Sequence, residues 1–267
     1  MKKFWAIFFW FWPVVALVLC VMAPSQGWWF PGPPGTQMGE RIQGLFELIL
    51  GIVTVTFIGT NFALGWVLWQ AASKGDDKKA FYSHGSHSLE LIWTIVPAFV
   101  LLFIALYQMD VWAEYRVQSF YPEETKQGSV AEFMARQFEW RVRYPAIGET
   151  LKDEAQPGDL YMVNELHVPA GRPVKINLRT QDVQHAFFAP QLRLKQDAVP
   201  GLIIPVWFDV PKAGNYDVTC AELCGWGHYK MKARIVVESQ QAVDAYMRKL
   251  QEEQTEDGFV EEAAEEE

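Results

Sequence analysis

Uncharged apolar stretches predict that the first part of the chain lies in a membrane. Residues 4–23, 48–72 and 91–109 contain no charged side chain. Each stretch is long enough to cross the hydrocarbon core of a bilayer as a helix, which needs about 20 residues. The hydropathy pattern therefore predicts three transmembrane helices.

Beyond residue 133 the pattern changes to short apolar runs that alternate with polar positions and are broken by Gly and Pro. Such alternation predicts β-strands rather than helices. The strand candidates are residues 138–144, 161–168, 174–178, 186–192, 203–209, 216–220 and 231–237. Short strands at this spacing are typical of an antiparallel sandwich. Residues 240–251 have a helical pattern, and we expect a terminal helix there.

The first apolar stretch has two readings. Lys2 and Lys3 precede it, as basic residues would precede either a spanning helix or a cleavable export signal. We favour a retained helix, because Phe and Trp are more crowded in it than export requires. Lys74, Lys78 and Lys79 lie between the second and third stretches. The positive-inside rule places that loop in the cytoplasm and the β-domain on the periplasmic or external face of a bacterial-type inner membrane.

The expected fold class is an α+β membrane protein, with N-terminal transmembrane helices followed by an all-β sandwich. We expect five segments: a transmembrane helix or signal at 1–23, an external loop at 24–44, a transmembrane helical hairpin at 45–112, an external β-domain at 113–238, and a terminal helix with an acidic tail at 239–267.

Two thiols, an imidazole and a thioether lie within twelve residues, at Cys220, Cys224, His228 and Met231. These are soft or borderline ligands, which select copper or zinc over magnesium and calcium, and the methionine favours copper. Two glycines between the second cysteine and the histidine supply the backbone freedom that a tight ligand loop needs. The segment therefore predicts a copper site.

Each of these residues also has a simpler explanation. Cys220 and Cys224, on the outer side of a membrane, could form a disulfide, and Met231 could pack in the core. A metal site needs a further ligand from another loop. His185 meets that requirement, because it begins an apolar run in the segment Asp182-Val-Gln-His185-Ala-Phe-Phe.

Taken together, these motifs resemble subunit II of the haem-copper cytochrome c oxidases. The resemblance rests on Asp-Val-x-His, on Asp197-Ala-Val-Pro-Gly201 and on Cys-x-Glu-x-Cys-x3-His-x2-Met, and it extends over roughly residues 45–237. It implies a cupredoxin-like Greek-key sandwich with ligands on loops at one end. It also implies that the chain accepts electrons from cytochrome c at a binuclear copper centre, CuA. The electrons would pass to the haem-bearing catalytic subunit I, where oxygen is reduced and protons are pumped.

By position, the resemblance assigns a role to each ligand. Cys220 and Cys224 would bridge two copper ions. One ion would be completed by His185 and Met231, and the other by His228 and the backbone carbonyl of Glu222. The side chain of that glutamate would also reach a magnesium or manganese ion at the boundary with subunit I.

Two further positions carry expectations from the resemblance. Glu90 begins Glu90-Leu-Ile-Trp-Thr-Ile-Val-Pro97, where the family places the entrance of a proton pathway; the simpler reading is an interfacial carboxylate. The family segment Gln-Trp-x-Trp reads here Gln-Phe138-Glu-Trp140. The tryptophan that usually receives the electron is thus Phe138, and Trp140 remains as a candidate for electron transfer. We therefore expect either cytochrome c or a haem c domain of the same assembly as donor.

The acidic tail has two readings. Residues 252–267 hold nine acids and no base, which equals the whole net charge of −9. We favour a solubilising tail over a lure for a basic electron donor. No Cys-x-x-Cys-His occurs in the sequence, so we expect no covalent c-type haem on this chain. The expected partners are other oxidase subunits, the donor and membrane lipid, and not nucleic acid.

Two other classes of function compete with an oxidase subunit. A copper-delivery protein for oxidase assembly also uses two Cys and a His, but it usually resembles thioredoxin, and the βαβ pattern of that fold is absent from the sequence. A redox-silent sandwich, as in quinol oxidases, would have lost the metal ligands. Every ligand position is retained here, which argues against this last class.

Overall fold

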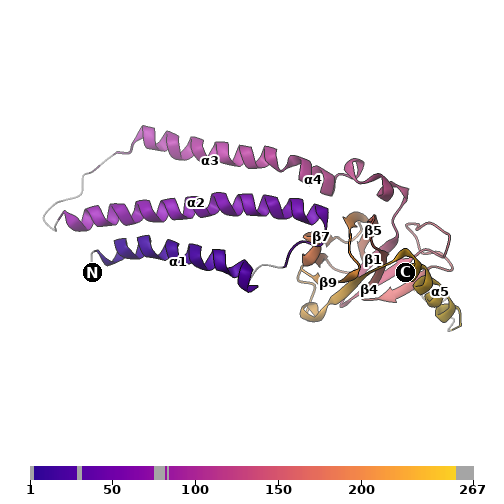
Figure 1. Ribbon diagram of the computed structural model, residues 1–267. Coiled ribbons are helices and arrows are strands. Elements are labelled where there is room, and N and C mark those ends of the chain that lie inside the picture. The colour runs from indigo at the N-terminus through magenta and orange to yellow at the C-terminus, as the bar shows by residue number, and fades with distance from the viewer. Residues whose placement is uncertain (1–2, 29–31, 75–81, 83, 257–267) are drawn as a thin grey trace. The chain divides into compact units, whose positions relative to one another are not determined.

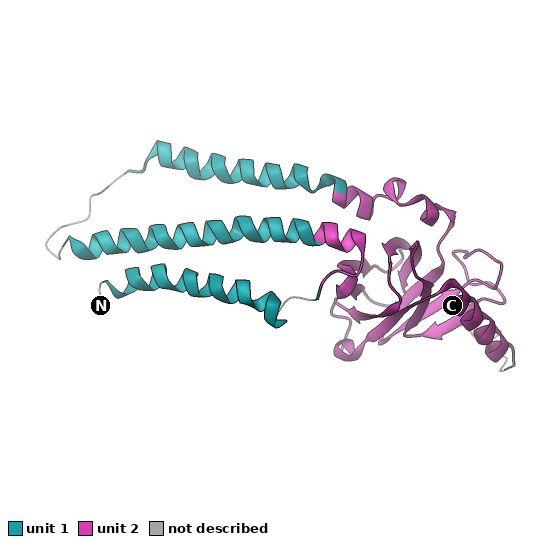
Figure 2. Cartoon of the chain, in the orientation of Figure 1, with its two compact units in different colours: residues 1–32, 43–110 teal, residues 33–42, 111–267 magenta. Residues whose placement is uncertain are grey.

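The computed structural model describes residues 3–28, 32–74, 82 and 84–256. It divides the chain into two compact units (Figure 2). The first contains residues 1–32 and 43–110, and the second contains residues 33–42 and 111–267. The part of the acidic tail beyond residue 256 lies outside the described residues.

The first unit is built from apolar helices (Figure 1). These are α1 Phe4–Gln26, α2 Gln37–Ser73, whose first turns belong to the second unit, and α3 His87–Tyr107. All three are long and apolar enough to cross a membrane, as the hydropathy pattern predicts. Two of the helices touch: the indole nitrogen of Trp10 donates to the carbonyl of Phe62 at 3.2 Å, and Gly65 leaves room for the ring, because a Cβ there would lie 2.5 Å from it.

The second helix begins earlier than the hydropathy pattern predicts. It starts at Gln37, inside the expected loop 24–44, rather than near residue 48. The hydroxyl of Thr36 accepts the N–H of Gly39 at 2.8 Å and caps the helix. The first turns are polar, and a search for uncharged stretches detects only the apolar part of a helix.

A sandwich of two five-stranded sheets forms the second unit. One sheet has the order β3-β2-β1-β5-β8, and the other has the order β4-β10-β9-β6-β7. The strands are β1 Ala131–Arg136, β2 Glu139–Tyr144, β3 Leu160–Val163, β4 Glu165–Pro169, β5 Pro173–Thr180, β6 His185–Ala189, β7 Leu194–Ala198, β8 Ile204–Asp209, β9 Gly214–Cys220 and β10 Lys232–Glu238. A short helix, α4 Met109–Arg116, precedes them, and α5 Gln240–Glu256 follows them.

The prediction of a sandwich is confirmed, but that of purely antiparallel strands is wrong. Strands β1 and β5 pair in parallel, as do β4 and β10. The predicted strand 161–168 is two strands, β3 and β4, which lie in different sheets. Asn164 separates them with a left-handed φ of 61°, which a regular strand does not accommodate. Strands β1 and β7 were not predicted.

Apolar side chains from both sheets fill the space between them, and they include Phe133, Trp140, Leu166, Phe187 and Ile235, all fully buried. The terminal helix α5 runs to Glu256, five residues beyond the predicted end at 251. Gln254 explains the extension, because its side chain accepts the N–H of Tyr161 at 3.1 Å and donates to the carbonyl of Tyr161 at 2.6 Å. The polar end of α5 thus completes the edge of β3.

Candidate metal centre

The predicted ligand loop connects two paired strands, β9 and β10. Thr219 pairs with Lys232 in the sheet, and the N–H of Cys220 donates to the carbonyl of Met231 at 3.1 Å. The two ends of the loop are therefore held together by the sheet. Strand β6 lies on the other side of β9, where Phe187 pairs with Cys220. This pairing brings His185, the first residue of β6, to the base of the loop.

The sulfur and nitrogen atoms of the predicted ligands meet in one cluster. The Sγ atoms of Cys220 and Cys224 are 3.9 Å apart, and neither residue forms a disulfide. The Nδ1 atom of His185 lies 3.7 Å from Sγ of Cys220, and Nδ1 of His228 lies 3.6 Å from Sγ of Cys224. The Sδ atom of Met231 is 3.9 Å from Sγ of Cys224. Each thiol thus has an imidazole nitrogen within 3.7 Å.

The cluster is buried at the end of the core. His185 is 0 % exposed, Met231 1 %, Cys224 4 % and Cys220 8 %. Ligand-type atoms of His185 and the two cysteines lie within 4.8 Å of one another, an arrangement that could hold a metal ion. The carbonyl of Glu222 lies 3.2 Å from Sγ of Cys220, so that this predicted oxygen donor also faces the cluster.

Asp182 fixes the orientation of His185. Its Oδ1 lies 2.8 Å from Nε2 of His185, which leaves Nδ1 directed at the thiol. The backbone N–H groups of Gln137 and Val183 also donate to this carboxylate, at 2.7 and 2.6 Å. Burial opposes ionisation, but these hydrogen bonds together lower the pKa of Asp182. The sequence motif assigns no role to Asp182, although its position three residues before His185 is a usable signal.

The two thiols differ in their acidity. Burial would raise the pKa of Cys220, but hydrogen bonds with His185, with the backbone of Ala186 and Glu222, and with His228 outweigh it and lower the pKa to about 6. Burial raises the pKa of Cys224 to about 12, and the neighbouring charge of Cys220 adds to this effect. One thiolate therefore forms readily, and the second requires a nearby positive charge.

An aromatic ring packs against the loop where it turns. Gly225 has a left-handed φ of 138°, and a Cβ at Gly227 would lie 2.5 Å from the ring of Phe138. The side-chain amide of Gln137 donates to the carbonyl of Cys224 at 2.5 Å. Both glycines are thus required, one for its backbone conformation and one because the ring occupies the space of a side chain.

Trp140 lies inside the domain and not on its surface. It is 0 % exposed, and its ring centre is 5.1 Å from that of Phe133 and 6.2 Å from that of His185. Its indole nitrogen has no hydrogen-bond partner among the described residues. If Trp140 takes part in electron transfer, it therefore does so inside the domain, without contact to a partner protein.

Glu90 belongs to the first unit, in the first turn of α3. Its side chain is exposed and its backbone N–H donates to the carbonyl of Ser86 at 2.9 Å. A carboxylate at this position also interacts favourably with the helix dipole. The proton-pathway role of Glu90 stays a prediction.

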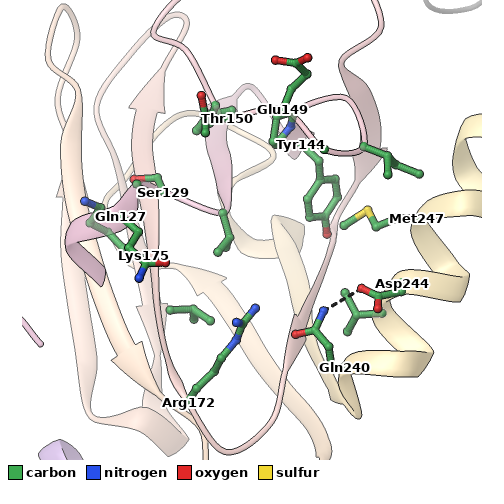
Figure 3. A pocket seen from close by; sticks show the side chains of 18 of the residues that line it. Gln127, Ser129, Tyr144, Glu149, Thr150, Arg172, Lys175, Gln240, Asp244 and Met247 are labelled. Atoms are coloured by element: carbon green, nitrogen blue, oxygen red, sulfur yellow. Dashed lines mark hydrogen bonds between the residues drawn. The ribbon is translucent and has the colours of Figure 1, made fainter. Parts of the chain in front are cut away.

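A separate cleft of about 860 Å³ lies between α5 and the sheet that contains β5 (Figure 3). Tyr144, Arg172, Lys175, Asp244 and Met247 are among the residues that line it, and none of the predicted metal ligands is. Cations and carboxylates both occur in its wall, so that its charge does not favour one class of ligand. The cleft is distinct from the metal cluster.

The fold and the donor set define a membrane protein that carries a β-sandwich with a buried cluster of residues that could hold a metal ion. Two family models match the chain: "Cytochrome C oxidase subunit II, transmembrane domain" over residues 28–111 and "Cytochrome C oxidase subunit II, periplasmic domain" over residues 134–240. The chain belongs to the cytochrome c oxidase subunit II family. It is thus a subunit of a terminal oxidase, and the predicted family is confirmed.

Individual relatives agree with this assignment. Cytochrome c oxidase subunit 2 of Thermostichus vulcanus is 26% identical, over 81% of this chain and 77% of the relative. The alternative cytochrome c oxidase subunit 2 of Bradyrhizobium diazoefficiens is 35% identical, over 43% of this chain and 49% of the relative. Among solved structures, the periplasmic domain of subunit II of cytochrome oxidase of Bradyrhizobium japonicum matches with 24% identity and a TM-score of 0.40, over 46% of this chain and 93% of that chain.

Proposed function

We propose that this chain is the subunit through which electrons enter its oxidase, and that it holds a binuclear copper centre, CuA. The observation that carries the proposal is the paired arrangement of the donors. Two thiols stand 3.9 Å apart and each faces its own imidazole nitrogen, at 3.6 and 3.7 Å. This arrangement suits two ions that share both thiolates better than it suits one ion.

The chemistry of the donor set fits copper. Thiolate, imidazole and thioether groups favour copper or zinc, and a weak axial methionine is typical of electron-transfer copper sites. Cys220, Cys224, His185, His228, Met231 and the carbonyl of Glu222 would hold the ions. A pair of copper ions there would accept one electron from a donor protein and release it to the haem-bearing catalytic subunit.

The residues around the donors keep their geometry fixed. Asp182 orients His185, the carbonyl of Met231 accepts the N–H of Cys220 at 3.1 Å, and Gln137 holds the carbonyl of Cys224. A site that only passes electrons works best when its ligands do not move between oxidation states. Burial also excludes water from the cluster.

The experiment is metal analysis and electron paramagnetic resonance on the purified oxidase complex. Beyond the copper that the catalytic subunit of a haem-copper oxidase itself holds, we expect two copper ions per chain and the signal of one electron shared between them. Met231→Leu should keep both ions and shift the reduction potential, because an axial thioether is a weak ligand. Met247→Leu, a methionine outside the cluster, is the matched control and should change neither. One copper per chain, or zinc in the presence of excess copper, would contradict the binuclear site.

We also propose that the side chain of Glu222 reaches a magnesium or manganese ion at the boundary with the catalytic subunit. Its carbonyl faces the cluster, and its half-buried side chain starts from the same loop. Glu222→Ala should leave the copper content unchanged and remove the second metal. Loss of both metals would show that the side chain serves the copper site itself.

The remaining proposals concern the membrane part. We propose that α1, α2 and α3 all cross the membrane, with the loop after α2 in the cytoplasm and the sandwich on the periplasmic side. Glu90 would then lie at the cytoplasmic end of α3, where it would admit protons to the pathway of the catalytic subunit. The alternative of a copper-delivery protein is not favoured, because the second unit is a β-sandwich.

A further inference from the structure

The cleft between α5 and the sheet that contains β5 has the size of a small-molecule site. Its volume of about 860 Å³ lies within the range of about 300–1,000 Å³ that is usual for ligand pockets. All of its wall belongs to the second unit, and none of the proposed metal donors lines it. Its chemistry is therefore independent of the copper site.

A buried hydroxyl in the wall has an unused hydrogen-bond donor. Tyr144 is 2 % exposed, and its side chain is directed into the cleft (Figure 3). Its oxygen accepts the backbone N–H of His167 at 2.7 Å, but its own O–H donates to no acceptor among the described residues. Burial raises the pKa of Tyr144, so that the hydroxyl keeps its proton at neutral pH. The O–H is therefore available to an acceptor atom of a ligand.

Two cations line the same cleft. Lys175 lies in β5 and is half-buried, and Arg172, immediately before β5, directs its guanidinium into the cleft (Figure 3). In the part of the chain that the structure describes, neither cation forms an ion pair. Burial lowers the pKa of Lys175, and a nearby anion would offset this effect. Both side chains can only donate hydrogen bonds, so they too call for an acceptor.

The carboxylates in the wall do not neutralise these cations. Glu124, Glu149 and Asp244 are all exposed. The side-chain amide of Gln240 already donates to Asp244 at 2.7 Å, and Glu149 points out of the cleft (Figure 3). Cations and carboxylates are thus both present in the wall, but they differ in direction and in partners.

We propose that this cleft binds a small organic anion, a phosphate ester or a carboxylate that also has an apolar part. The anionic oxygens would accept hydrogen bonds from Tyr144, Arg172 and Lys175, three donors on one side of the cleft. The apolar part would contact Val243 and Met247 of α5, which line the other side. A bound ligand would therefore join α5 to the sheet.

The test is equilibrium dialysis of phenyl phosphate against the purified oxidase complex in nanodiscs of zwitterionic lipid, with empty nanodiscs as the blank. We expect saturable binding of one molecule per chain, with a Kd on the order of 1 mM or lower for a ligand of this size. Phenol, which lacks the anionic group, should bind at least about tenfold more weakly, because the hydrogen bonds to a charged group are lost.

Lys175→Met should raise the Kd of phenyl phosphate about tenfold, because it removes a charge-assisted hydrogen bond and keeps a long side chain. Arg172→Met, at an exposed position, should raise the Kd as well and keeps the test open if the first variant does not fold. Lys249→Met is the matched control, because Lys249 of α5 pairs with Glu253 at 3.4 Å and does not line the cleft. It should change the Kd by less than about twofold.

The proposal is overturned if both cleft variants bind phenyl phosphate like the wild type, or if Lys249→Met weakens binding as much as they do. The anion would then bind to the basic surface in general. Phenol that binds as tightly as phenyl phosphate would also overturn it, since the cleft would then select apolar and not anionic ligands. Binding that appears only after deletion of residues 257–267 would mean that the acidic tail occupies the cleft, and binding in neither chain would mean that no such anion does. Either result rejects the small-anion site.

Discussion

Two buried polar clusters in the β-domain differ in how their charges are balanced. Arg143 is 2 % exposed, and its guanidinium nitrogens lie 3.1 Å from Glu132 and 2.7 Å from Asp159. This cluster contains both signs of charge at direct hydrogen-bond distance. In the metal cluster, two thiols and two imidazoles face one another at 3.6–3.9 Å, and no side chain among them is a permanent cation. Burial alone therefore does not define a functional site. In the first cluster the buried charges are paired with one another, whereas the second cluster brings together atoms of the types that bind metal ions.

The largest expected effect is the loss of the proposed copper pair when one of the two thiols of the ligand loop is removed. Cys220→Ser or Cys224→Ser should abolish the two-copper signal of the purified complex, because a hydroxyl at neutral pH does not replace a bridging thiolate. Cys20→Ser is the matched control, since Cys20 is exposed and lies in the first unit. Retention of both ions in either loop variant would contradict the assignment.

Substitutions in the cluster of Arg143, Glu132 and Asp159 should change the stability of the domain and not its metal content. Arg143→Met leaves Glu132 and Asp159 buried with a lost partner, which should lower the free energy of unfolding of the domain by about 3–5 kcal/mol. Arg136→Met breaks an ion pair with Glu139 that is about one-third exposed, and it should cost at most about 1 kcal/mol. Denaturant unfolding followed by tryptophan fluorescence gives both values. If both variants lowered the free energy of unfolding equally, the buried cluster would stabilise the domain no more than the exposed ion pair does.

The two thiols of the metal cluster should also differ in their pKa values. In the metal-free protein with the Cys20→Ser background, thiolate absorbance should appear in two steps, near pH 6 for Cys220 and near pH 12 for Cys224. The folded pKa of Cys220 is below its ordinary value of 9.0, so its thiolate stabilises the fold fully above pH 9, and this contribution is lost as the pH falls to about 6. Adding Cys220→Ser should lower the second step only in part, because burial, the larger cause of the raised pKa of Cys224, remains. A second step that does not move in this variant would show that the two thiols do not interact.

A smaller effect is expected in the first unit. Glu90→Ala should slow oxygen reduction several-fold and leave copper content and spectrum unchanged, because the role proposed for Glu90 is proton uptake and Glu90 belongs to the first unit, whereas the proposed metal donors belong to the second. Glu47→Ala, which removes an exposed carboxylate of α2, should leave turnover unchanged. Turnover is measured with an oxygen electrode and copper by metal analysis. Loss of copper in Glu90→Ala would contradict the separation of the two functions.

The smallest effect is expected from the tail. Deleting residues 257–267 removes six of the nine terminal acids and should change the rate of electron uptake from a basic cytochrome c by less than about twofold, because exposed charges are screened beyond about 8 Å at physiological ionic strength. Stopped-flow reduction across a salt series measures the rate. A steep salt dependence that disappears with the tail would show that the tail attracts the donor.

The proposed ligands could be chosen from the sequence because their chemistry is unusual and local. Cys220, Cys224, His228 and Met231 are close in the chain, and His185 was selected as a histidine at the start of an apolar strand. The sandwich followed from alternation, which a half-buried strand imposes on its own sequence. The membrane helices followed from the absence of charge.

Contacts between distant segments could not be predicted in the same way. The parallel pairing of β1 with β5 depends on where the chain crosses between the sheets, which no local pattern records. The extension of α5 depends on one amide of Gln254 that completes the edge of β3. The exposure of Trp226, on the ligand loop, and the burial of Trp140, in β2, both depend on which way each ring points in the folded domain, and the sequence shows only that both are tryptophans.

Because most of the proposed donors lie on one loop, the site can change in evolution independently of the rest of the domain. Five of the six proposed donors lie between Cys220 and Met231, and this segment joins two strands whose pairing is already set at Thr219 and Lys232. A lineage could therefore lose or replace the whole segment by one local exchange without altering the register of either sheet. His185, the first residue of β6, would then remain without the other donors. The proposed redox function thus depends almost entirely on one loop between two paired strands.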